Sequence, residues 1–363
     1  MSAAADIVDP AEAWRTFCAD LGALGDLITA PGNPAGPIDQ AEGFRYLTRL
    51  LRMGLEQQLE ARDPSFPFFY QLSHATAKIG ADNPDNVYWN ARIRGDWDYR
   101  ITVQRGSMSY FSIVANAFRY HIDGTLAATG TLTDSDITWD ADGCAVLIAS
   151  QTPQAENWLR LESDASLLVI RQSYLDRATE VPGTFAIERI GGPRAPEVLD
   201  NAGLAAGLAE AVGFVRGIVG TFVGWADQFR EHPNTFPAID QQMFQRGGGA
   251  KDLYYAHAYW RLAEDEAWVI EVAPPECEYW NFQLNNWWME SLDYRFLPVT
   301  VNKHTARYND DGSVTIVVAE RDPGYGNWIA TAGHREGTAL LRWGGAQEHP
   351  LPTTRIEQLP EEG

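Results

Sequence analysis

The chain has 363 residues, of which 45 % are hydrophobic and 21 % charged, so it can form two ordinary globular domains and is not disordered throughout. Acidic side chains outnumber basic ones by 49 to 28, and the net charge of −21 repels nucleic acids and anionic membrane surfaces. We therefore expect neither as a partner. The three cysteines, Cys18, Cys144 and Cys277, lie far apart, which argues against a disulfide framework and against a cysteine metal site.

The N-terminus and the most apolar segment bear on location. The start, MSAAADIVDP, lacks the basic residues and apolar run of a secretory signal. Residues 203–225 are strongly apolar but contain Glu210, Arg216 and six glycines, which favours a buried helix over a membrane span. We therefore expect a cytoplasmic protein.

Two helical stretches alternate with two β-rich stretches. After a helical or irregular lead-in over residues 1–40, a helix is predicted over 41–62, with Asp39 as its N-cap and Asp63-Pro64 as its end. Its apolar residues recur at steps of three and four: Phe44, Leu47, Leu51 and Leu55. A second helix follows the same plan and ends at His232-Pro233, with an apolar stripe of Leu204, Leu208, Val215, Phe222 and Phe229.

The two halves of the chain repeat each other. The prolines that end the two helices lie 169 residues apart, and the same offset aligns the apolar segments that follow. With two one-residue insertions, the alignment extends to Asn157-Trp158 with Asn327-Trp328, and to 168–171 with 339–342. An offset sustained over this length predicts an internal duplication. Features common to both copies, such as the Asn-Trp pairs, are expected to be structural.

The β-rich stretches are typical of antiparallel sheets. Turn signals such as Asp142-Gly143 and Asp311-Gly312 separate apolar runs, and no helical pattern lies between successive strands of a unit. The predicted fold class is α+β, predominantly β, with two tandem antiparallel β-sandwich units of jelly-roll style, each preceded by a helical segment. The expected units span 41–195 and 196–350, and an acidic, proline-containing tail occupies 351–363.

The second unit carries a motif that is similar to a known family. It comprises Tyr279-Trp280-Asn281-Phe282-Gln283-Leu284, Ser291-Leu292-Asp293-Tyr294, Asp322-Pro323-Gly324, Asn327-Trp328 and Arg342-Trp343. These residues resemble the domain of unknown function 1214 family over about the last 110 residues. The resemblance implies a jelly-roll β-sandwich, preceded by a domain similar to the 1254 family, to which the N-terminal half is weakly similar. It implies no particular reaction.

Comparison of the two copies indicates where chemistry could lie. The loop around residues 320–337 has polar residues that the first copy lacks, namely Asp322, Tyr325, His334 and Arg335. Together they could supply an acid or base (His334), its partner (Asp322), a proton donor (Tyr325) and an anion clamp (Arg335). The alternative is a surface hairpin that holds its own salt bridges.

A second set of residues could line a ligand pocket. Asn281, Gln283, Asn285 and Trp287 alternate along one strand face, opposite an apolar face, and Trp288 follows. His257 and His304 also lie on predicted strand faces, each with an ordinary buried or exposed histidine as the alternative. If sheets brought His257, His304 and His334 together, a metal or general-base site would result, although no close histidine pair has ligand spacing. We expect no metal and no cofactor.

The leading hypothesis is a small-molecule enzyme that uses acid-base chemistry, whether hydrolysis, elimination or isomerisation, on an apolar or mixed-polarity metabolite in an aromatic-lined pocket. The 13 Trp, 14 Tyr and 15 Phe suit such a pocket, and also suit a sheet core. The alternatives are a non-catalytic carbohydrate- or lipid-binding protein, and a scaffold subunit with a vestigial site. A small molecule is the expected partner, and a homo-oligomer stays open.

Overall fold

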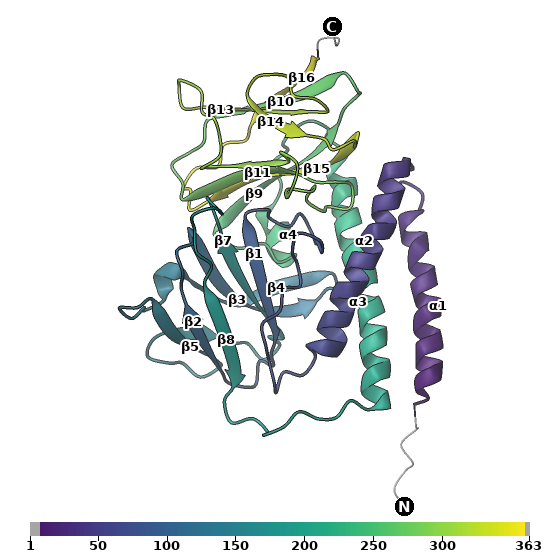
Figure 1. The fold of residues 1–363 in the computed structure, drawn as a ribbon, viewed down its shortest axis with the longest axis vertical. Coiled ribbons are helices and arrows are strands. Elements are labelled where there is room, and N and C mark those ends of the chain that lie inside the picture. Colours follow the sequence, from purple (N-terminus) through teal and green to yellow (C-terminus); the bar gives the residue numbers. More distant parts are fainter. Residues whose placement is uncertain (1–7, 360–363) are drawn as a thin grey trace, which may run out of the picture.

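Two β-rich units lie one above the other, and three long helices run along one side of both (Figure 1). The computed structural model describes residues 8–359. Much of the expected lead-in is a helix, α1 (Pro10–Ile28), whose N-cap Asp9 accepts a hydrogen bond from the Ala11 amide. Residues 1–7 of the lead-in lie outside the described part.

Each unit is a pair of packed four-stranded sheets. The strands of the first unit pair in the orders β1-β7-β3-β4 and β6-β5-β2-β8. Their bounds are β1 (Asn86–Arg92), β2 (Tyr99–Gln104), β3 (Tyr110–Arg119), β4 (Thr125–Thr133), β5 (Cys144–Ser150), β6 (Trp158–Arg160), β7 (Leu167–Ser173) and β8 (Thr184–Arg189).

The second unit repeats this topology strand for strand. Its sheets have the orders β9-β15-β11-β12 and β14-β13-β10-β16, which match those of the first unit position by position. The bounds are β9 (Leu253–Arg261), β10 (Glu266–Val272), β11 (Tyr279–Leu284), β12 (Thr300–Asn302), β13 (Val314–Ala319), β14 (Asn327–Ala330), β15 (Glu336–Gly344) and β16 (Thr353–Gln358). The predicted α+β fold with two tandem units is confirmed.

The Asn-Trp pair has the same structural role in both units. Asn157 bonds both the amide and the carbonyl of Thr138, and Asn327 does the same to Arg307. Each following tryptophan donates its indole N–H to a carbonyl on the neighbouring strand. The strands that begin near these pairs, β6 and β14, run parallel to their neighbours. Each sheet that contains such a pair is therefore mixed. A loop carries the chain from the end of β5 or β13 back to that strand's beginning, so that β6 or β14 runs in the same direction.

The helix boundaries differ from the prediction at both ends. α2 spans Pro37–Leu55 and continues as a π-helical turn over Glu56–Glu60. Its N-cap is Gly36 and Pro37 occupies the first turn, where a missing N–H costs nothing. Asp39 is thus not the N-cap, since it lies inside the first turn. α3 spans Asn201–Phe229, and the short α4 spans Gln241–Arg246.

The expected tail is part of the second sandwich. Residues 353–358 form β16, which pairs with β10 along its length, from Thr353 with Glu271 to Gln358 with Glu266. The prediction of a tail from 351 was wrong because this strand has an exposed, polar face and so lacks an apolar run. Residues 360–363 of that tail lie outside the described part.

Three large hydrophobic cores hold the described residues together, beside a small fourth cluster around Val269 and Val317. Each unit has a core between its own two sheets. The third core joins the helices to both units, and includes Tyr46 of α2, Phe222 of α3, Val169 of the first unit and Trp288 of the second. Because this core draws on both units, it fixes their relative position.

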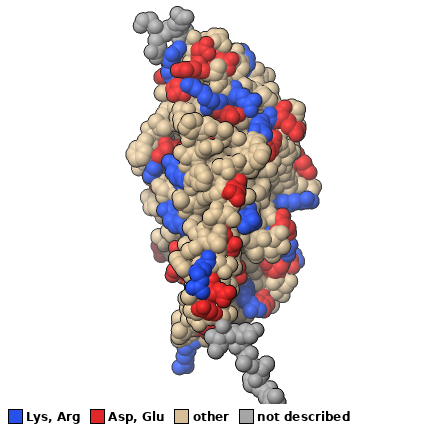
Figure 2. Space-filling view, turned by 90° about the vertical axis from the view of Figure 1, so that its right-hand side faces the viewer, with Lys and Arg blue, Asp and Glu red and all other residues tan. Residues whose placement is uncertain are grey.

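α3 lies along both units in Figure 1 and packs against α1 and α2. Among the described residues it alone is long and apolar enough, by length and composition, to cross a membrane. As predicted for residues 203–225, much of it is buried in the third core. On the side of the molecule that carries the helices, basic and acidic side chains are intermixed and form no patch of a single sign (Figure 2).

Candidate functional site

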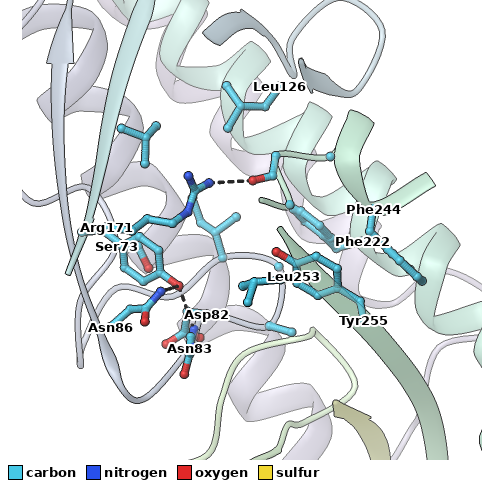
Figure 3. A pocket seen from close by; sticks show the side chains of 18 of the residues that line it. Ser73, Asp82, Asn83, Asn86, Leu126, Arg171, Phe222, Phe244, Leu253 and Tyr255 are labelled. Carbon is cyan, nitrogen blue, oxygen red and sulfur yellow. Dashed lines mark hydrogen bonds between the residues drawn. The ribbon is translucent and has the colours of Figure 1, made fainter. Parts of the chain in front are cut away.

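A cavity of about 150 Å³ lies where the two units meet the helices (Figure 3). A volume of this size accommodates a molecule roughly as large as benzene. Strands β1 and β7 of the first unit and β9 and β15 of the second contribute side chains to it. The polar residues that line it are Ser73, Asp82, Asn83, Asn86, Tyr88, Asn90, Tyr120, Arg171, Tyr255, His257 and Arg342, and the apolar ones include Phe118, Leu126, Phe222, Trp225, Phe244 and Leu253.

Strand alternation explains why equivalent residues of the two units meet in this cavity. In β7, Leu168 and Ile170 point into the first sandwich, so Val169 and Arg171 point the other way. In β15, Leu341 points into the second sandwich and Leu340 and Arg342 face the cavity. Arg171 and Arg342 are the residues that the internal alignment pairs. The duplication therefore places one arginine from each unit at the same cavity.

Arg171 is buried, with 8 % of its surface exposed, and its hydrogen bonding is incomplete. Its Nη2 donates to the carbonyl of Gly248 at 2.6 Å, whereas Nη1 is buried without a hydrogen-bond partner among the described residues. Figure 3 shows the guanidinium reaching across the cavity toward that carbonyl, with the Tyr255 hydroxyl pointing into the same space. Arg171 can therefore donate a further hydrogen bond to a ligand.

Arg342 is 4 % exposed and is held by neutral groups. Its Nη1 donates to the side-chain oxygens of Asn281 and Gln283, and its Nη2 donates to the carbonyl of Ala81 at 2.6 Å. The guanidinium lies 6.0 Å from the centre of the Tyr255 ring. These contacts fix the position of Arg342 beside the cavity without neutralising its charge.

His257 of β9 is the cavity's uncharged basic group. Its ring stacks on Phe229 and packs against Phe244, with centroid distances of 4.7 and 4.5 Å. Burial, reinforced by the positive charge of Arg342, lowers the pKa of His257 well below its ordinary value, so the imidazole is neutral. Its Nδ1 is buried and has no hydrogen-bond partner within residues 8–359. In the first unit the equivalent residue, opposite Val169 as His257 is opposite Leu340, is Asn90, whose side-chain oxygen accepts a hydrogen bond from the Leu72 amide.

The glycine-rich segment 247–249 closes one side of the cavity. The Tyr120 hydroxyl donates to the Gly247 carbonyl and Arg171 donates to that of Gly248, whose φ of +96° favours glycine. The Tyr255 hydroxyl accepts a hydrogen bond from the Ala250 amide at 2.7 Å, which leaves its own proton free to donate. The segment is thus anchored by cavity side chains.

The predicted catalytic loop does not assemble as a site. Asp322 accepts a hydrogen bond from the Gly324 amide within an exposed turn, and the exposed Tyr325 donates to Glu357 at 2.6 Å. Arg335 lies 3.4 Å from Glu320. These partners are those of a surface hairpin with its own salt bridges, which was the stated alternative.

His334 lies apart from its expected partner Asp322. It is buried against the first two turns of α2, with Nε2 3.0 Å from Glu42 and Nδ1 3.5 Å from Asp39. Burial alone would lower the pKa of His334, but the two carboxylates outweigh it and raise the pKa to about 9. An imidazole that is charged at neutral pH and lies between two carboxylates acts as a structural cation, so the assignment of His334 and Asp322 as an acid-base pair is corrected.

The predicted pocket strand has the expected two faces. Trp280, Phe282 and Leu284 point into the sandwich, and Asn281 and Gln283 point away from it. The amides, however, lie behind the cavity wall. Asn281 donates to Asn83 at 2.8 Å, and Gln283 donates to the Asp82 carbonyl at 2.9 Å and to Asn285 at 2.6 Å. Asn83 and Asp82 line the cavity, whereas Asn281, Gln283 and Asn285 do not. They position Arg342 and the 81–83 segment.

Trp287 and Trp288 are not pocket walls either, because both are fully buried in the third core. Trp287 packs against Tyr259, and Trp288 donates its indole N–H to the Asp39 carbonyl of α2. His304 is exposed, 3.8 Å from Asp176. Of the predicted ligand-binding residues, only His257 lines the cavity.

The three histidines do not gather into one site. His257 faces the cavity, His304 lies beside Asp176, and His334 lies against α2. Within residues 8–359, no three His, Cys, Asp or Glu side chains are grouped so that they could hold a metal ion.

A protein from Burkholderia cenocepacia, known from its crystal structure, is 46 % identical to this chain, over 96 % of this chain and 97 % of that one, with a TM-score of 0.93. The chain belongs to the family of that protein. Residues 259–348 match the family described as protein of unknown function DUF1214, which confirms the resemblance of the C-terminal half. The likeness of the N-terminal half to the 1254 family stays a prediction.

A protein from Vibrio parahaemolyticus has the same fold at 12 % identity, with a TM-score of 0.50 over 87 % of this chain and 98 % of that one. No curated protein matches the chain.

Sequence reasoning missed Arg171, although one signal could have found it. The internal alignment places an arginine at the same position of two otherwise apolar strands, which is unusual for buried positions.

Proposed function

We propose that the protein binds a small molecule of mixed polarity in the cavity between its two units. The observation that carries this proposal is the convergence there of Arg171, Arg342, His257 and the Tyr255 hydroxyl, opposite a wall of apolar side chains such as Phe222. A pocket with a few convergent polar groups and an apolar remainder is typical of small-molecule sites. The modest volume favours a ligand of about ten non-hydrogen atoms or fewer.

The test is recovery of a bound compound. The purified protein is equilibrated with a soluble metabolite extract, washed and denatured, and the released compounds are identified by mass spectrometry. The expected result is one compound class retained by the wild type and lost from Val169→Phe, which fills the cavity from β7. Val146→Phe, at a half-exposed position of β5, is the matched control. Equal retention by both variants would place the ligand elsewhere and overturn the proposal.

An acid-base enzyme is the second candidate. The observation that favours it is His257, a neutral imidazole with an unpartnered Nδ1 at the cavity. A neutral imidazole can accept a proton at neutral pH, which a histidine with a raised pKa cannot do. In this reading His257 replaces His334 as the base, and the reaction would again be hydrolysis, elimination or isomerisation.

The two candidates differ in the fate of the ligand. If the protein is an enzyme, incubation with the extract converts the compound that it binds, and His257→Gln retains binding but loses conversion. If it is a binding protein, the compound is recovered unchanged from wild type and variant alike. Conversion at an undiminished rate by His257→Gln would exclude His257 as the base.

A further inference from the structure

The two cavity arginines lack the partner that buried arginines normally have. Within residues 8–359, no carboxylate oxygen lies within 4.0 Å of the guanidinium nitrogens of Arg171 or Arg342. Arg49 provides the contrast, because it is similarly enclosed and contacts Glu290 at 2.6 Å. A buried charge without a counter-ion is costly, and an arginine cannot shed its proton to avoid that cost. Two such charges at one cavity therefore indicate a missing anion.

The acidic residues nearest the cavity are already engaged. Asp82 accepts hydrogen bonds from both the amide and the hydroxyl of Ser291, and its charge interacts with Lys78. Asp85 accepts from the Tyr279 hydroxyl and from Asn302. Asp85 interacts electrostatically with Arg342, but neither carboxylate forms an ion pair with Arg171, so the unpartnered Nη1 of Arg171 is left for a counter-charge that a ligand supplies.

We propose that the ligand of this cavity is a small organic monoanion, specifically a carboxylate with a flat apolar body. This inference rests on the proposed function and names its ligand class. One carboxylate oxygen accepts from Nη1 of Arg171, and the free proton of the Tyr255 hydroxyl donates to the other. The positive charge of Arg342, at the cavity wall, stabilises the ligand's carboxylate electrostatically without contacting it. The apolar body lies against the rings of Phe222, Phe244 and their neighbours.

The first experiment uses isothermal titration calorimetry of the full chain with benzoate, benzamide and inorganic phosphate. Benzoate and benzamide have nearly the same shape and differ in charge. We expect benzoate to bind one-to-one and at least tenfold more tightly than benzamide, and phosphate to bind more weakly still. Equal binding of benzoate and benzamide would overturn the anion inference and leave the proposed function standing. Phosphate binding as tight as that of benzoate would overturn the organic ligand. If neither aromatic compound binds, the ligand class proposed here is wrong, and only the extract experiment then decides the proposed function.

The second experiment identifies the charge responsible. Arg171→Met removes the charge and keeps the length of the side chain, whereas Arg171→Lys keeps the charge and loses the planar fork. We expect Arg171→Met to weaken benzoate binding at least tenfold with benzamide binding unchanged, and Arg171→Lys to have an intermediate effect. Arg100→Met is the matched control, since Arg100 pairs with Glu188 on the surface of the first unit. Circular dichroism confirms folding of each variant. Unchanged benzoate binding by folded Arg171→Met would exclude Arg171 as the anion partner.

Discussion

His334, Asp39 and Glu42 join parts of the chain almost 300 residues apart. The imidazole lies on the second unit, and the two carboxylates lie on the first two turns of α2. Burial alone would raise the pKa of Glu42, but the charged imidazole of His334 stabilises the carboxylate and lowers this pKa to about 2. From the sequence, Asp39 was predicted to be an N-cap and His334 a catalytic acid or base. Only the docking of α2 on the second unit makes them one ion pair network.

This network predicts a pH-dependent stability. The folded pKa of His334, about 9, is above its unfolded value of 6.5, so its contribution is complete below pH 6.5 and is lost as the pH rises through 9. The shift corresponds to roughly 3 kcal/mol. We expect the free energy of unfolding of the wild type to exceed that of His334→Gln at pH 6, with the gap narrowing toward pH 10. Urea denaturation across this range measures it, with exposed His304→Gln as control. A constant gap would contradict the ion-pair assignment.

α2 is an element whose position depends on one small residue. Gly43 lies buried in this helix, and a Cβ there would come within 2.6 Å of Trp288 and of Ile28 in α1. The absence of a side chain lets the indole of Trp288 approach the helix closely enough to bond the Asp39 carbonyl. The sequence pattern predicted the helix itself but not this contact, because Trp288 belongs to the other unit.

Alanine substitutions at two helical glycines test this packing. Helix propensity alone favours alanine over glycine by about 1 kcal/mol. At Gly43 the clash with Trp288 should exceed this gain, so we expect Gly43→Ala to lower the free energy of unfolding by about 1–3 kcal/mol. At Gly220 of α3 no atom lies within 4 Å of the added Cβ, so Gly220→Ala should raise it by up to about 1 kcal/mol. Chemical denaturation gives both values, and a stabilising Gly43→Ala would mean that α2 is not packed this closely.

At the scale of the whole molecule, the third core makes two units into one body. Phe118 of the first unit, Tyr259 of the second and Ile218 of α3 all belong to it. Hydrogen bonds also cross between the units, as from Asn281 to Asn83 and from Arg342 to the Ala81 carbonyl. The cavity exists only in this arrangement, since both units and α3 supply residues to its lining.

Such shared packing predicts cooperative unfolding. Loss of either unit would expose the third core, so neither unit is expected to persist alone. We expect tryptophan fluorescence, which weights the second unit and its many indoles, and far-ultraviolet circular dichroism, which weights the helices, to give one coincident guanidinium transition. Separate midpoints for the two signals would show that the units unfold independently.

The sequence by itself determined the fold class, the duplication and the two faces of strands such as β11, because apolar periodicity and a constant offset are local properties that survive without tertiary contacts. It also placed Arg171 and Arg342 at equivalent positions. What it could not determine was which faces meet. Whether His334 would be a base or a bound cation, and whether Trp288 would line a pocket or fill a core, depended on where α2 docks. The cavity is formed by contacts between residues that are 77 to 261 positions apart, as in Arg171 with Gly248 and Arg342 with Ala81, and only the tertiary structure decides those.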